Sequence, residues 1–300
     1  SYELAYRLFF ELGPPRRAAQ RVLGWLGGEG LRRTVADYRA DIVIAEFPVL
    51  SAALGELRAR GRLPVPVCSS ISDPAGLYYW VHPGIDLHLL SWPEAIPEAD
   101  RIAGPGRAVA VRPMIDERFV PGASPEEARA RLALAPDATV VTVSGGGWGV
   151  GDVAGAVERV RAVCPRAVVV ALAGRSEPLK ARLEAAYGGQ PQVRVLGFTD
   201  RMPDLMAASD ALIHTTGGTT ALEARVMGCP LINYGRGVAH VRAHAQAMAR
   251  QGLAKWARHP GELSGALRRT LAAGRPAPQD VSSYPDPAEV VVALGRNSSR

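Results

Sequence analysis

Two glycine-rich turns in the second half of the chain contain the residue types that bind phosphate. The first, from Ser144 to Gly151, has five glycines, and the second has adjacent Gly217 and Gly218. Each turn lies between a run of β-branched residues and a helix-like stretch. Backbone N–H groups and a helix N-terminus can surround phosphate oxygens there. The pattern predicts a diphosphate site, and the structural alternative for the first turn is a tight turn that packs against Trp148.

The carboxylate closest in sequence to the second turn is Glu223. It follows Thr220 by three residues, which is the spacing of a capping box, so Glu223 can simply satisfy an N-terminal amide of the helix. The functional interpretation is that Glu223 accepts hydrogen bonds from ribose hydroxyls. Both interpretations remain open from the pattern alone.

A dinucleotide-dependent dehydrogenase is disfavoured by two departures from its fingerprint. The first turn has Val150 where G-x-G-x-x-G needs its last glycine. The next strand ends at Gly174-Arg175 without the acidic residue that binds ribose in such folds.

A metal site is not indicated either. His240 and His244 are four residues apart, as metal ligands on a helix can be, but no Glu follows the first His and no third ligand is evident. The chain also has no Asp-x-Asp, so we expect backbone dipoles and arginine, not a divalent cation, to neutralise a diphosphate. Asp73 follows a strand in the first half and is either a turn residue or a group that faces substrate.

Composition limits the classes of partner. The chain of 300 residues has 35 basic and 29 acidic residues, a formal net charge of +6, and only two of the basic residues are lysine. Arginine suits phosphate and carboxylate, so acidic ligands or an anionic membrane surface fit. Aromatic content of 6% and the lack of long basic runs disfavour nucleic acid. Three widely spaced cysteines fit a reducing cytosol, and no stretch has the length of a membrane-spanning helix.

The elements that would position these residues alternate regularly in the second half, as in a parallel sheet covered on both faces. Strands are predicted at 138–143, 167–173, 193–197, 210–214, 230–234 and 253–257. Helices are predicted at 152–163, 176–187, 203–208, 219–227, 240–251 and 261–272. The result is a six-stranded Rossmann-like domain.

The first half repeats the pattern more weakly. Four strands are predicted near 41–46, 64–69, 86–91 and 108–112, and residues 1–12 form an amphipathic helix that either packs on the sheet or faces lipid. We expect an incomplete N-terminal domain, and a fragment of a longer chain, because two strands and an initiator Met are missing. The expected domains are 1–115 and 116–278, with a tail at 279–300 that can return as a helix to the first domain.

Several motifs together resemble one family. They are Ser144 to Gly151, Gly197-Phe198-Thr199-Asp200 with Met202, Thr216-Gly217-Gly218-Thr219-Thr220 with Glu223-Ala224, and Ser72-Asp73 with Trp80-Val81-His82-Pro83-Gly84-Ile85-Asp86. They resemble metal-independent inverting glycosyltransferases of the two-domain GT-B architecture, specifically the monogalactosyldiacylglycerol synthase and diacylglycerol glucosyltransferase family, which is similar to MurG. The resemblance implies an α/β fold in which two Rossmann-like domains face a cleft.

The resemblance also implies a reaction and its partners. A hexose, galactose or glucose, would pass from a UDP-sugar, which is a substrate, to a diacylglycerol-type lipid without cofactor or metal, at the inner face of the cell membrane. The UDP-sugar would contact Gly145, Gly146, Gly147, Trp148, Arg175, Phe198, Thr199, Met202, Thr216, Gly217, Gly218, Thr219, Thr220, Glu223, His240 and His244. Asp73 is the catalytic candidate, because the acid/base loop usual in the family would precede Ser1.

Departures from the family pattern define the alternatives. Ala239 stands where members have Gly, and His244 stands where they have Asn, which affects donor-sugar recognition. A UDP-sugar 2-epimerase shares the architecture but should have acidic residues where Thr219 and Thr220 stand. A nucleotide-binding remnant without transfer activity is the non-enzymatic alternative.

Overall fold

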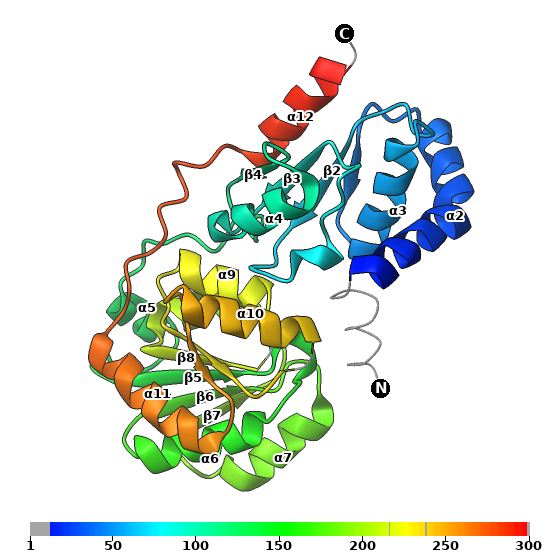
Figure 1. Ribbon diagram of the computed structural model, residues 1–300. Helices are drawn as coiled ribbons and strands as arrows, with labels where there is room; N and C mark the ends of the chain where they lie inside the picture. Colours follow the sequence, from blue (N-terminus) through cyan, green and yellow to red (C-terminus); the bar gives the residue numbers. More distant parts are fainter. Residues whose placement is uncertain (1–12, 216, 238, 299–300) are drawn as a thin grey trace. The chain divides into compact units, whose positions relative to one another are not determined.

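The computed structural model describes residues 13–215, 217–237 and 239–298, which divide into two compact units (Figure 1). Unit 1 comprises residues 1–114 and 281–300, and unit 2 comprises residues 115–280. The helix predicted for residues 1–12 and the predicted site residue Thr216 lie outside the described residues.

Unit 1 is built on a four-stranded parallel sheet in the order β1-β2-β3-β4. The strands are β1 (Val43–Ala45), β2 (Val67–Ile71), β3 (Leu87–Leu90) and β4 (Ala108–Ala110). The helices are α2 (Gly13–Asp37), α3 (Pro48–Ala59), α4 (Ile96–Ala103) and α12 (Pro287–Ser298). The four strands predicted from the sequence all form.

The last helix of the chain belongs to this unit. Val290, Val291 and Leu294 of α12 pack against a buried cluster that includes Cys68 and Leu89. An ion pair also joins Arg112, which follows β4, to Asp286, which directly precedes α12. Burial of apolar side chains on the sheet therefore fixes α12 to unit 1.

Helix α2 was not predicted, because Gly13–Asp37 contains Gly and Pro at several positions that lower helix propensity. It forms through tertiary packing. Leu31 and Val35 pack against the buried cluster that contains Leu54 and Leu57 of α3. Packing of an apolar stripe thus outweighs a weak local preference.

Unit 2 is built on a six-stranded parallel sheet in the order β10-β9-β8-β5-β6-β7. The strands are β5 (Val140–Ser144), β6 (Val168–Leu172), β7 (Val193–Leu196), β8 (Ala211–His214), β9 (Leu231–Tyr234) and β10 (Lys255–Ala257). The helices are α5 (Pro125–Arg131), α6 (Val153–Val163), α7 (Glu177–Tyr187), α8 (Met202–Ala208), α9 (Thr219–Val226), α10 (Ala239–Arg250) and α11 (Pro260–Ala273). The six strands and six helices predicted for this region are confirmed to within about three residues at each end.

The sheet of unit 2 is covered on both faces, which explains why its strands are continuous apolar runs. All five residues of β5 are buried. Helices α6, α7 and α11 contribute to the large core on one face, and Figure 1 shows α9 and α10 on the other. A smaller core on that second face includes Leu134, Val170 and Leu205. The doubly covered α/β fold predicted from the alternating pattern is confirmed.

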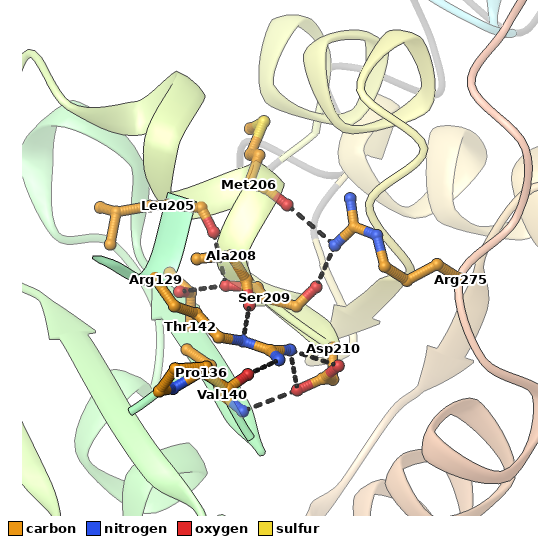
Figure 2. A network of polar contacts seen from close by, with 10 residues as sticks. All are labelled: Arg129, Pro136, Val140, Thr142, Leu205, Met206, Ala208, Ser209, Asp210 and Arg275. Atoms are coloured by element: carbon orange, nitrogen blue, oxygen red, sulfur yellow. Dashed lines mark hydrogen bonds and ion pairs between the residues drawn. The ribbon is translucent and has the colours of Figure 1, made fainter. Parts of the chain in front are cut away.

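A buried arginine network holds α8 in place (Figure 2). Arg129 of α5 is 7% exposed and donates to both carboxylate oxygens of Asp210 at 2.9 and 3.0 Å and to the Ala208 carbonyl. Arg275 donates to the Met206 and Ser209 carbonyls. These bonds satisfy backbone carbonyls at the end of α8.

Among the described residues, no helix combines the length and the apolar character needed to cross a bilayer.

Candidate functional site

The glycines of the first turn allow two turns to meet backbone against backbone. A Cβ on Gly149 would lie 2.5 Å from the Ala173 carbonyl, and one on Gly174 would lie 2.5 Å from the Gly146 carbonyl. Both glycines have positive φ, at 64° and 60°. The glycine density is therefore required by contact between the turns that follow β5 and β6. Packing against Trp148, the structural alternative, is wrong, because that ring is 72% exposed.

The helix after the first turn does not offer an open N-terminus. Asp152 is the N-cap of α6 and accepts a hydrogen bond from the Gly155 N–H at 2.9 Å. The Tyr234 hydroxyl also donates to this carboxylate at 3.2 Å. Because a carboxylate already occupies the position, the expectation that phosphate binds at this helix N-terminus is wrong for α6.

Helix α9 differs from α6 at the same position. Its N-cap is Gly218, which makes no side-chain hydrogen bond, and the helix runs through Thr219 and Thr220. Gly218 has φ 77° and ψ −126°, a conformation that other residues rarely adopt. Among the residues that the structure describes, the positive end of the α9 dipole therefore has no capping side chain, which suits an anionic ligand.

A cavity connects the ends of the central strands in unit 2, with a volume of ≈ 80 Å³. It lies where parallel strands end, which is where α/β folds bind ligands. Six residues predicted from the sequence line it: Gly146, Gly147, Phe198, Thr199, Met202 and Thr220.

Four further lining residues were not predicted as site residues. They are Ser144, Leu172, Gly174 and Gly197, and each is the end of a strand or the first residues after it. The Ser144 hydroxyl accepts a hydrogen bond from the Gly146 N–H at 3.1 Å, which holds the turn. The signal that identifies them is position at the carboxyl edge of the sheet, independent of residue type.

Arg175 and two aromatic rings form one surface beside this cavity. The Arg175 guanidinium lies 3.7 Å from the centroid of Phe198 and 5.8 Å from that of Trp148. Phe198 is 58% exposed. The exposed rings can stack on a planar base, and the guanidinium between them can pair with an anion.

Glu223 lies one helical turn beyond Thr220 in α9. The helix begins after Gly218, so Thr220 is not the N-cap and the capping-box interpretation of Glu223 is wrong. Burial, and secondarily the negative charge of Asp116, raise the pKa of Glu223 to about 7. A carboxyl group that is costly to ionise without partners is suited to accept hydrogen bonds from a ligand.

The histidines of α10 lie behind the second glycine turn. A Cβ on Gly217 would lie 3.0 Å from Nδ1 of His244, which is 2% exposed, so this turn packs closely on the helix. The His240 and His244 rings meet edge to face at 5.6 Å between centroids. In the described part of the chain, no group of three His, Cys, Asp or Glu side chains is placed to hold a metal ion.

Unit 1 contributes the predicted catalytic residue. The Asp73 carboxylate accepts a hydrogen bond from Trp80 Nε1 at 2.6 Å. Gly84 of the nearby His-Pro-Gly segment donates its N–H to His82 Nδ1, and a Cβ on Gly84 would lie 2.1 Å from the Gly55 carbonyl. The Trp-Val-His-Pro-Gly segment is therefore explained by packing on α3, and it also orients Asp73 through Trp80.

Comparison with known families matches both units. Residues 1–107 match the family model for monogalactosyldiacylglycerol (MGDG) synthase, and residues 139–272 match that for glycosyl transferases group 1. Each of the two units is thus similar to a glycosyltransferase family. The resemblance inferred from the motifs is thereby confirmed.

Individual relatives agree with this assignment. The chain is 26% identical over 226 residues to a processive diacylglycerol beta-glucosyltransferase of Bacillus subtilis (strain 168). The aligned region covers 70% of this chain and 55% of that protein. The chain spans about half the length of the curated relatives it matches.

Solved structures show the same fold. MurG of Acinetobacter baumannii aligns with a TM-score of 0.59 at 15% identity, covering 88% of this chain and 77% of that one. Alr3699/HepE of Anabaena in complex with UDP aligns with a TM-score of 0.54 at 15% identity, covering 90% and 80%. The α/β GT-B fold class predicted from the sequence is confirmed.

Proposed function

We propose that this protein transfers a hexose, galactose or glucose, from a UDP-sugar to a diacylglycerol-type lipid with inversion at the anomeric carbon. The observation that carries the proposal is the cavity at the strand ends of unit 2, bounded by the uncapped start of α9 and the Arg175–Phe198 contact. The similarity to a diacylglycerol glucosyltransferase and to a UDP-bound GT-B structure supports the lipid acceptor and the donor.

Each part of UDP has a complementary group in unit 2. The base stacks near Phe198 and Thr199, and the ribose hydroxyls donate to Glu223. The diphosphate lies at the start of α9, where Thr219 and Thr220 follow Gly218. Helix dipole and arginine replace a divalent cation in this scheme, so no metal or cofactor is needed.

The chemistry is a single displacement. The acceptor hydroxyl oxygen forms a bond to the anomeric carbon while the bond from that carbon to the diphosphate oxygen breaks, and the bonding pair leaves with UDP. The hydroxyl proton passes to a general base, for which Asp73 is the candidate in this chain. The Trp80 indole, which donates a hydrogen bond to Asp73, orients the carboxylate.

The proposed lipid acceptor determines where in the cell the reaction takes place. A diacylglycerol substrate is confined to a bilayer, so we propose a peripheral protein at an anionic membrane surface on the cytoplasmic side. The formal net charge of +6 favours such a surface.

The test is transfer from radiolabelled UDP-galactose and UDP-glucose, and from GDP-mannose as a donor control, to diacylglycerol in mixed vesicles. The expected product is a labelled glycolipid that forms only when a UDP-sugar is supplied and that a β-glycosidase cleaves. UDP binding without any glycolipid from either donor would contradict the transfer function. Absence of UDP binding would contradict the site itself.

A further inference from the structure

A second cavity in unit 2, of ≈ 200 Å³, lies next to the candidate nucleotide site and is not used by it. Thr199 lines both cavities. The remainder of its wall is mostly aliphatic: Leu132, Leu134, Val170, Leu196 and Leu205. An apolar cavity of about 150 Å³ accommodates a six-carbon ring, so this one has room for a short hydrocarbon chain.

Two arginines form the polar part of the wall. Arg194 of β7 donates from its terminal nitrogens to the Leu132 and Ala133 carbonyls, each at 2.5 Å. Arg201 donates to the Arg131 carbonyl at 3.0 Å. A guanidinium has five N–H groups, so these bonds orient both cations at the cavity and leave donors for a further acceptor.

The charge around the cavity is unbalanced. The Arg131 and Arg201 side chains share one carboxylate, that of Asp204, at 3.3 and 3.0 Å. Within the described residues, the partners of Arg194 are neutral carbonyls and no ion pair is found for it. Arg194 and Arg201 line the cavity, and among the described residues only Arg201 has a carboxylate partner, so the lining favours a ligand with a negative head group.

We propose that this cavity binds a fatty-acid carboxylate, with the aliphatic chain among the leucines and the carboxylate on Arg194. The occupant must combine a hydrocarbon chain with an anion, because the wall combines an aliphatic interior with a guanidinium for which the described residues supply no carboxylate partner. The proposal does not depend on sugar transfer. It depends only on the geometry of β6, β7, α5 and α8.

The experiment is calorimetric titration of the full chain with octanoate, 1-octanol and acetate. We expect saturable octanoate binding, with octanol and acetate each weaker by about tenfold or more, since a charge-assisted hydrogen bond and chain burial each contribute on that scale. Arg194→Met removes the cation and should weaken octanoate by about tenfold. Leu196→Phe fills the cavity and should abolish binding. Arg182→Met, an exposed arginine on α7, is the matched control and should have no effect.

Circular dichroism and the melting temperature of the same samples report whether each variant is folded, and UDP titration reports separately on the proposed nucleotide site. Octanoate binding that is absent in the wild type would overturn the proposal. So would binding that is unchanged in both Arg194→Met and Leu196→Phe, or octanol binding as tight as octanoate. Failure of UDP binding with intact octanoate binding would count against the proposed function alone.

Discussion

Glu223 is the residue at which burial and ligand binding are most directly linked. Its carboxylate is ionised reluctantly because burial raises its pKa to about 7. Ribose hydroxyls would supply the hydrogen bonds that the ionised form needs. The proposed nucleotide site therefore uses a carboxyl group whose ionisation costs stability when no ligand is bound.

Replacing Glu223 with Gln should weaken UDP by about 1.5–3 kcal/mol at pH 8, because the charged acceptor is lost. Since UDP prefers the ionised carboxylate, the wild-type advantage over Glu223→Gln should shrink as pH falls from 8 to 6. Calorimetric UDP titration at both pH values measures this. Glu158→Gln, at an exposed position on α6, is the control. Equal UDP affinity of wild type and Glu223→Gln at pH 8 would exclude the ribose role.

The same pKa makes a prediction about stability. The folded state holds the Glu223 proton up to about pH 7, whereas the unfolded chain releases it near the ordinary glutamate pKa of 4.5. Between these values the folded state binds more protons, so this residue's contribution to stability falls as pH rises. Glu223→Gln should gain in melting temperature relative to wild type between pH 4.5 and pH 8. Thermal unfolding at both pH values tests the sign.

Asp73 is predicted from its place after a strand and from the family pattern. Asp73→Asn keeps an oxygen that can accept from Trp80 Nε1, so melting temperature should change little. If Asp73 is the general base, transfer should fall by about 10²–10⁴ while UDP affinity is unchanged. Asp41→Asn, at an exposed position in unit 1, is the control. Unchanged turnover would place the base elsewhere.

At the scale of elements, the strand ends determine the site more than residue types do. The six strands of unit 2 are predicted from the sequence because short, mostly apolar runs alternate with helix-like stretches and are bounded by turn residues. It did not identify Ser144, Leu172, Gly174 and Gly197 as lining residues, because their role comes from the order β8-β5-β6-β7, which brings distant segments together. It also could not show that Asp152 caps α6, because that contact depends on exact helix bounds.

The contact between the turns after β5 and β6 should be sensitive to a single methyl group. Gly174→Ala places a Cβ 2.5 Å from the Gly146 carbonyl at a φ of 60°. We expect a loss of at least about 1 kcal/mol of stability together with weaker UDP binding, since the displaced turn lines the cavity. Gly189→Ala is the control, because a Cβ at Gly189 would have no heavy atom of another residue within 4 Å. Chemical denaturation and UDP titration give the two readouts.

The hydrogen bonds and the ion pair around Arg129, which hold the end of α8, should contribute to the free energy of unfolding. Asp210→Asn leaves Arg129, which is 7% exposed, without its carboxylate. Removing one partner of a buried pair typically costs about 3–5 kcal/mol. Urea unfolding should show this loss, and a cost below about 1 kcal/mol would mean that the carbonyl acceptors of Arg129 suffice.

At the scale of the whole molecule, the charge is distributed unequally between the units. Residues 115–280 contain 20 basic and 15 acidic residues, a balance of +5, and the remainder of the chain contains 15 and 14, a balance of +1. With the predicted domain limits, 115/116 and 278/279, Asp280 falls in the remainder of the chain, and the two balances are +6 and 0. Unit 2 therefore carries most of the electrostatic attraction for anions.

The surplus of basic residues in unit 2 should make membrane binding sensitive to the salt concentration. Basic residues near an anionic bilayer contribute about 1 kcal/mol each, and exposed charges are screened beyond about 8 Å at physiological ionic strength. We expect the protein to bind phosphatidylglycerol vesicles at low salt and to dissociate progressively between about 50 and 500 mM NaCl, with little binding to pure phosphatidylcholine. Cosedimentation at each salt concentration measures this. Equal, salt-independent binding to both vesicles would show that apolar contacts, and not the surplus arginine of unit 2, hold the protein at the membrane.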